Sequence, residues 1–258
     1  MVVPNSNLPL VSVILTTRDR PRLLSVALAC YRHQTYPNRE LIVVDDGDRH
    51  PVDPRAVEGL GGRVIRAAPG TLLGAKLNRG VEQARGAWCQ KMDDDDWYAP
   101  DFLEAMISAV EQERKKVCRP SIAILTPFLF FEVARWEVRR SAGHNAPGAT
   151  LLFAREDWEQ HPFRAVPRDE DVWFVRDQQR AGLEVVLVRA LESFLAVRHR
   201  GSLQDRGHTW THQGNGSILE DGLQERPLHR RRPEDLLPEW ALAVYRPLHQ
   251  ELSTAAAT

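Results

Sequence analysis

The chain has 258 residues, of which 43% are hydrophobic and 27% are charged, so it can form one large globular domain or two small ones. Its formal net charge of -1 excludes a global field that would attract nucleic acid or anionic lipid, and no nucleic-acid partner is expected. Three widely separated cysteines argue against a disulfide framework and favour a reducing compartment.

No stretch of the chain has the roughly 20 apolar residues that a membrane-spanning helix requires. The most apolar run, residues 122–134, is short and contains Thr126, Pro127 and Glu132. The N-terminus lacks the charged start and apolar core of a secretory signal. The sequence therefore predicts a cytoplasmic protein without a transmembrane segment.

Strands and helices alternate through the first part of the chain. Short apolar runs rich in β-branched residues predict buried strands, and periodic apolar residues predict helices. In chain order these are a strand at 10–15, a helix at 22–31, strands at 40–44 and 64–67, a helix at 74–84 and a strand at 87–92. This alternation predicts an α/β fold with a mostly parallel central sheet flanked by helices.

The remaining elements are less regular. We expect a helix at 100–110, strands within 122–133 and at 136–140 and 150–154, a helix at 169–181, and strands at 185–188 and 193–198. Residues 199–232 are polar and basic, which is typical of a loop or lid, and a C-terminal helix is predicted at 234–252.

Polar residues follow three of the predicted strands, at 16–18, 45–46 and 93–96. Ligands of parallel sheets bind beyond the carboxyl ends of the strands, so these residues should converge on one crevice. Four adjacent aspartates repel one another unless a cation compensates them. Mg²⁺ and Mn²⁺ prefer oxygen ligands and often share them with substrate phosphates.

Alternate residues of an extended segment point to the same side, so Asp93 can act with Asp95, and Asp94 with Asp96. One pair would reach a metal and a sugar, while the other, Asp96 above all, can cap the following turn or helix. The alternative is a solvated acidic loop. The apolar strand directly before the aspartates favours a functional site.

Six segments in this order resemble family 2 glycosyltransferases of the GT-A fold, over roughly residues 10–200. They are VSVILTTRDR at 11–20, QTYP at 34–37, ELIVVDDG at 40–47, NRG at 78–80, DDDD at 93–96 with Pro100, and EDVWF at 170–174.

The resemblance implies a Rossmann-like sheet with a smaller acceptor-side subregion and a C-terminal helical extension. It implies a nucleotide-sugar-binding half at 1–115, an acceptor-binding and catalytic-base half of the same domain at 116–200, and a lid loop with the C-terminal helix at 201–258. The implied reaction moves a sugar from a nucleoside-diphosphate sugar, most commonly a UDP-sugar, to a hydroxyl group with inversion, using Mn²⁺ or Mg²⁺.

The resemblance also implies roles for the donor site. Thr16 would line the nucleoside pocket, and Asp46 would bind the uracil or ribose edge. Asp93 and Asp95 match the family's Asp-x-Asp pattern, with Asp95 the direct metal ligand, and Asp94 would contact ribose or sugar hydroxyls.

Two positions depart from the family's pattern, so the nucleotide contacts of Arg18 and Asn78 stay open. Many relatives carry an Arg before the Asn of the middle helix, where this chain has Leu77, with Lys76 one residue away. Arg18 stands where an aromatic residue often follows the first strand. Arg18 and Asn78 are kept as nucleotide-binding candidates.

Two further features complete the predicted site. An inverting displacement needs a carboxylate to take the proton of the acceptor hydroxyl, and the resemblance assigns this role to Asp171, with Glu170 in reserve. Both can equally be carboxylates that a helix N-terminus stabilises. His208 and His212, four residues apart in the predicted lid, could act as metal ligands, and His208 joins Asp93 and Asp95 in the predicted set. The alternative is that both are surface histidines of a mobile polar loop.

Three other functions compete with glycosyl transfer. A sugar-nucleotidyltransferase would need a glycine-rich loop after the first strand, and residues 16–21 contain no glycine. A phosphohydrolase would need its nucleophile after the first strand, whereas Asp46 follows the second. A catalytically silent sugar-nucleotide-binding or carbohydrate-binding protein stays the alternative.

The sequence does not identify the acceptor, which can be a saccharide, a natural product, a lipid-linked sugar or a peptide. A homodimer is compatible with the sequence.

Overall fold

The computed structural model describes residues 8–116, 120–141, 147–199 and 231–255. Its main sheet has seven strands in the order β10-β6-β9-β4-β1-β2-β3. Their bounds are Val11–Thr17 for β1, Arg39–Asp45 for β2, Arg63–Arg66 for β3, Trp88–Asp93 for β4, Pro120–Leu125 for β6, Leu152–Ala154 for β9 and Glu184–Val188 for β10. Only β9 runs antiparallel to its neighbours in this sheet, so the expected mostly parallel sheet is confirmed.

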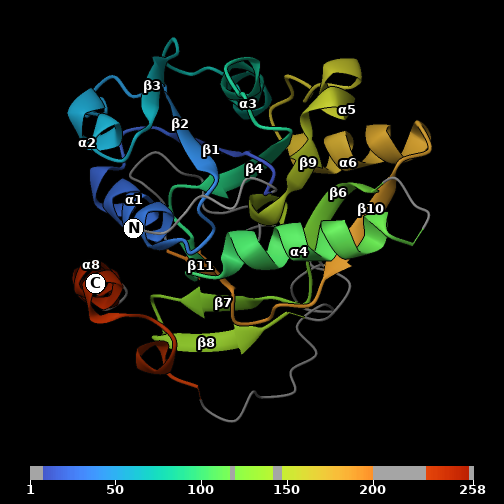
Figure 1. Cartoon of the computed structure of the whole chain (residues 1–258). Helices are drawn as coiled ribbons and strands as arrows, with labels where there is room; N and C mark the ends of the chain where they lie inside the picture. The colour runs from blue at the N-terminus through green and yellow to red at the C-terminus, as the bar shows by residue number, and fades with distance from the viewer. Residues whose placement is uncertain (1–7, 117–119, 142–146, 200–230, 256–258) are drawn as a thin grey trace.

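A second sheet of four strands lies beside the first, in the order β5-β11-β7-β8 (Figure 1). It consists of Trp97–Tyr98 (β5), Leu129–Glu132 (β7), Glu137–Arg140 (β8) and Phe194–Arg198 (β11). Strand β5 follows the four aspartates directly and pairs with β11, so the second sheet borders the predicted site.

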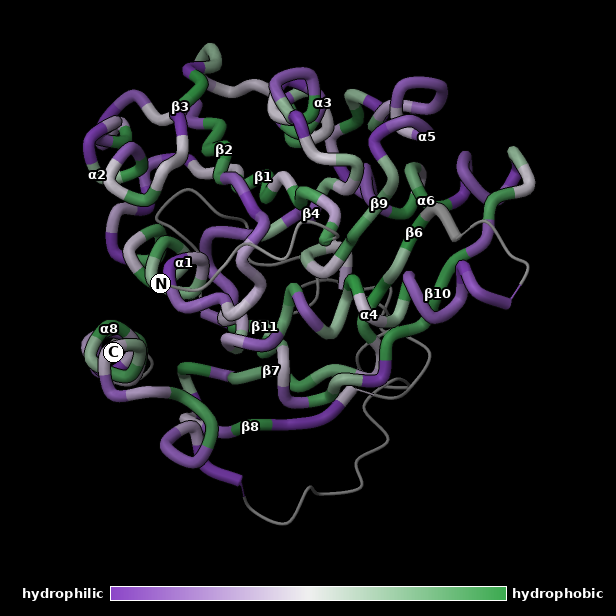
Figure 2. Tube along the Cα trace, in the orientation of Figure 1, coloured by the Kyte–Doolittle hydropathy of each residue, from purple (hydrophilic) through white to green (hydrophobic). Residues whose placement is uncertain are grey.

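Helices cover both faces of the main sheet (Figure 1). Their bounds are Pro21–His33 (α1), Pro54–Glu58 (α2), Leu73–Glu82 (α3), Phe102–Arg114 (α4), Arg155–Gln160 (α5), Glu170–Arg180 (α6) and Glu239–Ala255 (α8), with short 3-10 turns at Gly148–Thr150 and Pro233–Asp235. Strand β1 explains the two layers: Val13 and Leu15 pack into the larger apolar cluster with α1 and α4, and Ile14 into the smaller one with α3 and α6. Apolar residues line the central strands in Figure 2.

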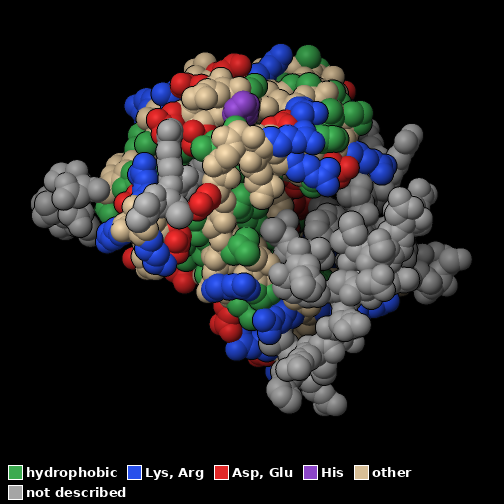
Figure 3. Space-filling view, turned by 90° about the vertical axis from the view of Figure 1, so that its right-hand side faces the viewer, with side chains coloured by type: hydrophobic (Ala, Val, Ile, Leu, Met, Phe, Trp, Pro, Cys, Tyr) green, Lys and Arg blue, Asp and Glu red, His purple; other side chains and the backbone are tan. Residues whose placement is uncertain are grey.

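Nearly all of the predicted elements are present, with shifted ends. The sequence interpretation missed the short elements α2, α5 and β5, whose lengths leave no periodic pattern to detect. The C-terminal helix begins at Glu239 instead of residue 234, because a 3-10 turn and Pro238 come first. Among the described residues, no helix combines the length and apolar character of a membrane span. Basic and acidic side chains are interspersed on the face in Figure 3, as the net charge of -1 leads one to expect.

Helix α3 lies so close to the sheet that one of its positions accepts only glycine. A Cβ on Gly80 would lie 2.5 Å from Ile14 Cγ2 and 3.2 Å from Val44 Cγ2, inside the smaller apolar cluster. This contact fixes the depth at which α3 packs, and α3 carries Asn78, one of the residues predicted to bind the nucleotide.

We expect Gly80→Ala to destabilise the fold although alanine favours helices. The added methyl group overpacks the contact with Ile14, which costs about 1–3 kcal/mol and outweighs a propensity gain of about 1 kcal/mol. Urea unfolding should show the loss, and Arg79→Ala on the exposed face of α3 should change stability by less than about 0.5 kcal/mol. A Gly80→Ala protein more stable than wild type would contradict this packing.

Candidate functional site

Three strand ends meet at one edge of the main sheet. Thr16 of β1 pairs with Val44 of β2 and with Asp93 of β4. The Thr17 hydroxyl donates a 2.6 Å hydrogen bond to Asp94 Oδ2. The convergence predicted for the polar residues after these strands is therefore confirmed.

The aspartates form a largely buried acidic cluster. Asp94, Asp95 and Asp96 are each 4% exposed, whereas Asp93 is half-buried. Carboxylate oxygens of Asp93, Asp95 and Asp96 lie within 4.8 Å of one another, close enough to share one cation. Hard oxygen donors of this kind suit Mg²⁺ or Mn²⁺. Asp96 thus extends the pair that the sequence predicted.

Asp96 does not cap a helix, so that part of the sequence interpretation was wrong. Helix α4 begins at Phe102, beyond strand β5. Asp96 Oδ1 instead accepts a 2.8 Å hydrogen bond from the Val197 N–H of β11. Burial, together with the charges of Asp95 and Asp93, raises the pKa of Asp96 to about 8.

Arg20, in the loop between β1 and α1, compensates two of the aspartates. Its Nη1 lies 3.1 Å from Asp94 Oδ1 and 2.9 Å from Asp95 Oδ2. Burial raises the pKa of Asp94 to about 6, although the Arg20 charge opposes that shift. The cluster therefore keeps its fold partly through a cation supplied by the chain itself.

A buried lysine connects the aspartates to the predicted base. Lys91, two residues before the cluster, is 2% exposed, and its Nζ lies 2.7 Å from Asp93 Oδ1. Burial opposes its charge, but Asp93, Glu170 and Asp171 together raise the pKa of Lys91 above its ordinary value. Sequence analysis missed Lys91, although a lysine inside a buried strand is a signal of a paired charge.

His199 follows β11 directly and contacts the predicted metal ligand. Its ring is buried, and Nε2 lies 3.2 Å from Asp95 Oδ2. Arg198, the last residue of β11, interacts electrostatically with Asp96, Asp95 and Asp93. The predicted ligand His208 and its neighbour His212 lie outside the described residues, so their roles stay predictions. The position of His199 at a strand end could have identified it from the sequence.

Asp46 is held from two sides. Its Oδ1 accepts a 2.7 Å hydrogen bond from Lys76 Nζ, and its Oδ2 accepts one of 3.1 Å from the Gly70 N–H. Lys76 Nζ also lies 3.5 Å from the Thr17 carbonyl oxygen. Leu77 is buried in the smaller apolar cluster. The cation next to Asp46 therefore comes from Lys76, one residue before Leu77, where the family resemblance led us to expect arginine.

The other nucleotide-binding candidates differ in their surroundings. Thr16 is buried at the end of β1, and Arg18 is exposed just after it. The Asn78 amide donates to the Phe163 carbonyl at 2.8 Å, and its oxygen accepts from Trp158 Nε1 at 2.9 Å and from the Phe163 N–H at 3.0 Å. The side chain of Asn78 thus fastens α3 to α5 and the segment after it, and its nucleotide contact stays a prediction.

The predicted base lies at the start of α6. Asp169, with a positive φ of 61°, precedes the helix, and Glu170 and Asp171 occupy its first turn. Glu170 is buried, which raises its pKa, whereas Asp171 is half-buried. A Cβ at Gly148 would lie 1.8 Å from Asp171 Oδ2, so only glycine allows the carboxylate this position.

Tyr98 braces the cluster against the segment next to Asp171. The Asp93 N–H donates a 2.8 Å hydrogen bond to the Tyr98 hydroxyl, which donates in turn to the Ala149 carbonyl at 3.1 Å. Ala149 follows Gly148, so one phenol fixes the two sides of the site relative to each other.

Comparison with known proteins places this geometry in a family. Residues 12–160, more than half of the chain, match the sequence model described as glycosyl transferase family 2. The chain belongs to this family. EpsH of Bacillus subtilis, named as a glycosyltransferase, is 32% identical to this chain over 108 residues. The match covers 41% of this chain and 31% of EpsH. A glycosyltransferase of Rickettsia bellii, named as uncharacterized, is 29% identical over 110 residues, or 42% of this chain and 16% of that protein.

Solved structures confirm the expected GT-A fold. Residues 1–349 of S. aureus TarS in complex with UDP-GlcNAc superpose with a TM-score of 0.59, at 15% identity, over 77% of this chain and 61% of that one. The same TarS fragment in another crystal structure gives a TM-score of 0.57 at 14% identity, over 72% of this chain and 60% of that one. The matched region spans less than a third of EpsH and of the Rickettsia protein.

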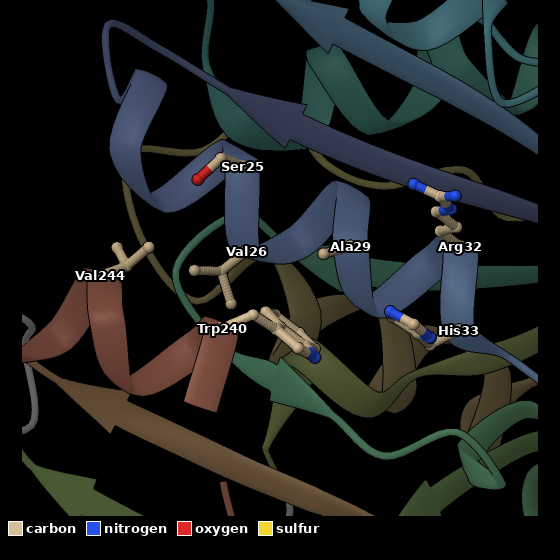
Figure 4. Close-up of a pocket in the computed structure, with 7 residues that line it drawn as sticks. All are labelled: Ser25, Val26, Ala29, Arg32, His33, Trp240 and Val244. Atoms are coloured by element: carbon tan, nitrogen blue, oxygen red, sulfur yellow. The ribbon is translucent and has the colours of Figure 1, made fainter. Parts of the chain in front are cut away.

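A hollow of this family 2 chain lies outside the acidic cluster, between α1 and α8 (Figure 4). The Trp240 ring of α8 stacks on His33 of α1, with 5.6 Å between the ring centroids. Val26 and Val244 complete the apolar wall. This contact fastens the C-terminal helix to the first helix of the family 2 domain.

The raised pKa of Asp96 predicts how stability depends on pH. The unfolded chain ionises this group near 3.8, whereas the folded protein holds the proton up to about pH 8. The folded state therefore binds more protons between these values, and this group lowers the free energy of unfolding as the pH rises through the window.

Asp96→Asn removes that cost while its amide oxygen still accepts the Val197 bond. With chelator present, we expect equal stability of the two proteins near pH 4 and a variant more stable by at least about 1 kcal/mol near pH 9, in urea unfolding. Asp101→Asn, at an exposed position, serves as control. A variant destabilised equally at both pH values would show that the Asp96 charge supports the fold.

Proposed function

We propose that this chain is a metal-dependent glycosyltransferase that moves a sugar from a nucleoside-diphosphate sugar, with UDP as the nucleotide, to a hydroxyl acceptor with inversion. The observation that carries the proposal is the acidic cluster at the strand ends, with His199 on Asp95 and the Glu170–Asp171 pair on the other side of Lys91. Family membership and the UDP-GlcNAc complex of the similar TarS fold support the choice of donor.

The donor set fits a divalent cation. Carboxylate oxygens of Asp93, Asp95 and Asp96 lie within 4.8 Å of one another, and His199 Nε2 lies 3.2 Å from Asp95 Oδ2. These residues would hold Mn²⁺ or Mg²⁺, which neutralises the charge that develops on the leaving diphosphate. In this proposal His199 supplies the nitrogen ligand that the sequence had assigned to His208.

The nucleoside would bind at the strand ends beside the cluster. Thr16 is buried at the end of β1, and Arg18 just after it is exposed. Asp46 and Lys76 present a carboxylate and an ammonium group 2.7 Å apart. Such a pair complements an N–H donor next to a carbonyl acceptor, as on the edge of uracil. Asp94, which accepts a hydrogen bond from Thr17, would contact the ribose or the donor sugar.

Asp171 is the better candidate for the general base. Glu170 is buried, and burial raises its pKa, so it is less accessible to an acceptor hydroxyl than Asp171. Asp171 is half-buried, and Gly148 leaves its Oδ2 closely packed in one position. A carboxylate held in place and partly open to solvent can take a proton from a hydroxyl group.

The metal assignment predicts linked binding of UDP and Mn²⁺. Ligands at about 100 times their Kd stabilise a protein by about 2.7 kcal/mol, which raises the Tm by several degrees. We expect this rise for UDP with Mn²⁺, its loss with chelator, and its loss in Asp95→Asn. Asp101→Asn should keep it. Stabilisation that survives both chelator and Asp95→Asn would contradict the metal site.

The base assignment predicts a separation of binding from turnover. Asp171→Asn should lower kcat by about 10²–10⁴ while UDP binding is nearly unchanged, because the carboxylate acts only on the acceptor proton. The readout is release of the nucleoside diphosphate from a panel of nucleotide sugars. Asp169→Asn, just before the helix and exposed, is the matched control. Equal loss of binding and turnover would make Asp171 structural, and turnover by no donor would favour a silent binding protein.

A further inference from the structure

Arg20 holds an unusual position among the cations of the acidic cluster. Its Nη1 bridges two aspartates that belong to different functional groups, Asp94 on the sugar side and Asp95 on the metal side. The two carboxylate side chains are 5% and 4% exposed, whereas the Arg20 side chain is 22% exposed. The arginine thus enters the cluster from its open side.

The Arg20 contact falls on the same Asp95 oxygen that His199 contacts. Asp95 Oδ2 receives both Arg20 Nη1 at 2.9 Å and His199 Nε2 at 3.2 Å, so this atom already faces the imidazole nitrogen of the proposed metal set. A divalent cation bound to that oxygen would lie close to the guanidinium group, and like charges at such a separation repel strongly in a largely buried site. Arg20 and the metal therefore compete for Asp95.

Arg20 is more accessible than Lys91, another cation that contacts an aspartate of the cluster. The Lys91 side chain, on strand β4, is 3% exposed, whereas that of Arg20 is 22% exposed. Arg198 is the last residue of strand β11, which pairs with two neighbours. Arg20 instead lies just before α1, where its carbonyl accepts the Leu24 N–H at 2.9 Å, so its long side chain can change partner while its backbone stays in place.

A diphosphate is the natural second partner for such a side chain. Guanidinium groups bind phosphate oxygens through two parallel hydrogen bonds, which a lone carboxylate oxygen cannot offer. Arg20 starts from the loop after Thr17, whose hydroxyl contacts Asp94 at the donor pocket. The bound donor would therefore draw Arg20 away from Asp95 and leave that oxygen to the metal.

We propose that Arg20 is a positioning residue that couples metal binding to nucleotide binding, by occupying Asp95 until the diphosphate of the donor takes its guanidinium group. This inference rests on the proposed function, because it presumes the metal and the diphosphate at this site. In this arrangement the metal site is selective for the metal together with a nucleotide. Coupling between two binding sites is reciprocal, so it can be measured as the effect of UDP on Mn²⁺ affinity or of Mn²⁺ on UDP affinity.

Isothermal titration calorimetry of Mn²⁺ with and without UDP tests the coupling. Wild type should bind Mn²⁺ weakly alone and much more tightly with UDP. Arg20→Gln, whose amide still donates to one carboxylate, should bind Mn²⁺ alone at least about fivefold more tightly and show a correspondingly smaller gain from UDP. Arg22→Gln removes only an exposed pair with Glu251 and should behave as wild type.

A second readout covers a poorly folding variant. Without Arg20, two buried carboxylates lose their shared cation, so Arg20→Gln should melt lower than wild type in chelator and gain more from Mn²⁺ alone. Arg20→Lys keeps the positive charge but lacks the planar guanidinium group. Its Tm in chelator, and the rise in Tm that Mn²⁺ causes, should lie between those of wild type and Arg20→Gln.

The outcomes separate the two proposals. Normal cooperative binding of Mn²⁺ and UDP in Arg20→Gln, with unchanged affinity for Mn²⁺ alone, would overturn the role of Arg20 and leave the proposed function intact. Wild type that binds UDP but no Mn²⁺ under any condition would overturn the metal site, and the coupling with it.

Discussion

The structure depends on the balance of charge around four consecutive aspartates. Three of them are almost fully buried, and each has a partner from a different part of the chain: Asp94 meets Thr17 and Arg20, Asp95 meets Arg20 and His199, and Asp96 meets the backbone of Val197. An uncompensated buried carboxylate is costly, so these partners are conditions for folding as well as parts of a site.

The fold brings the partners together at little cost. Parallel pairing of β1 with β2 and β4 puts their polar ends at one edge, and β11 of the second sheet adds its last residues from the other side. Lys91 then extends the network through the sheet toward Glu170 and Asp171, and Tyr98 fixes the intervening backbone. The acidic cluster and the Glu170–Asp171 pair are therefore one electrostatic unit, so a change in one should affect the other.

The sequence was sufficient for the α/β fold, the GT-A resemblance and the convergence of residues after three strands, because buried parallel strands leave apolar runs that end in polar residues. It was not sufficient for the cations. Arg20 and His199 reach the aspartates only through tertiary contacts. Lys91 precedes the aspartates by two residues, but its interaction with Glu170 and Asp171 is visible only in the structure. For Asn78 the motif predicted a nucleotide contact, but in the structure its amide joins α3 to Phe163 and Trp158.

The most direct test of the metal centre is a crystal structure with Mn²⁺ and UDP, analysed by anomalous scattering of manganese. We expect one strong anomalous peak at coordination distance from an Asp95 oxygen and His199 Nε2. The diphosphate should lie next to this peak, and the Arg20 guanidinium should contact the phosphates. A diphosphate bound by basic side chains alone, with no anomalous peak at the aspartates, would contradict this expectation.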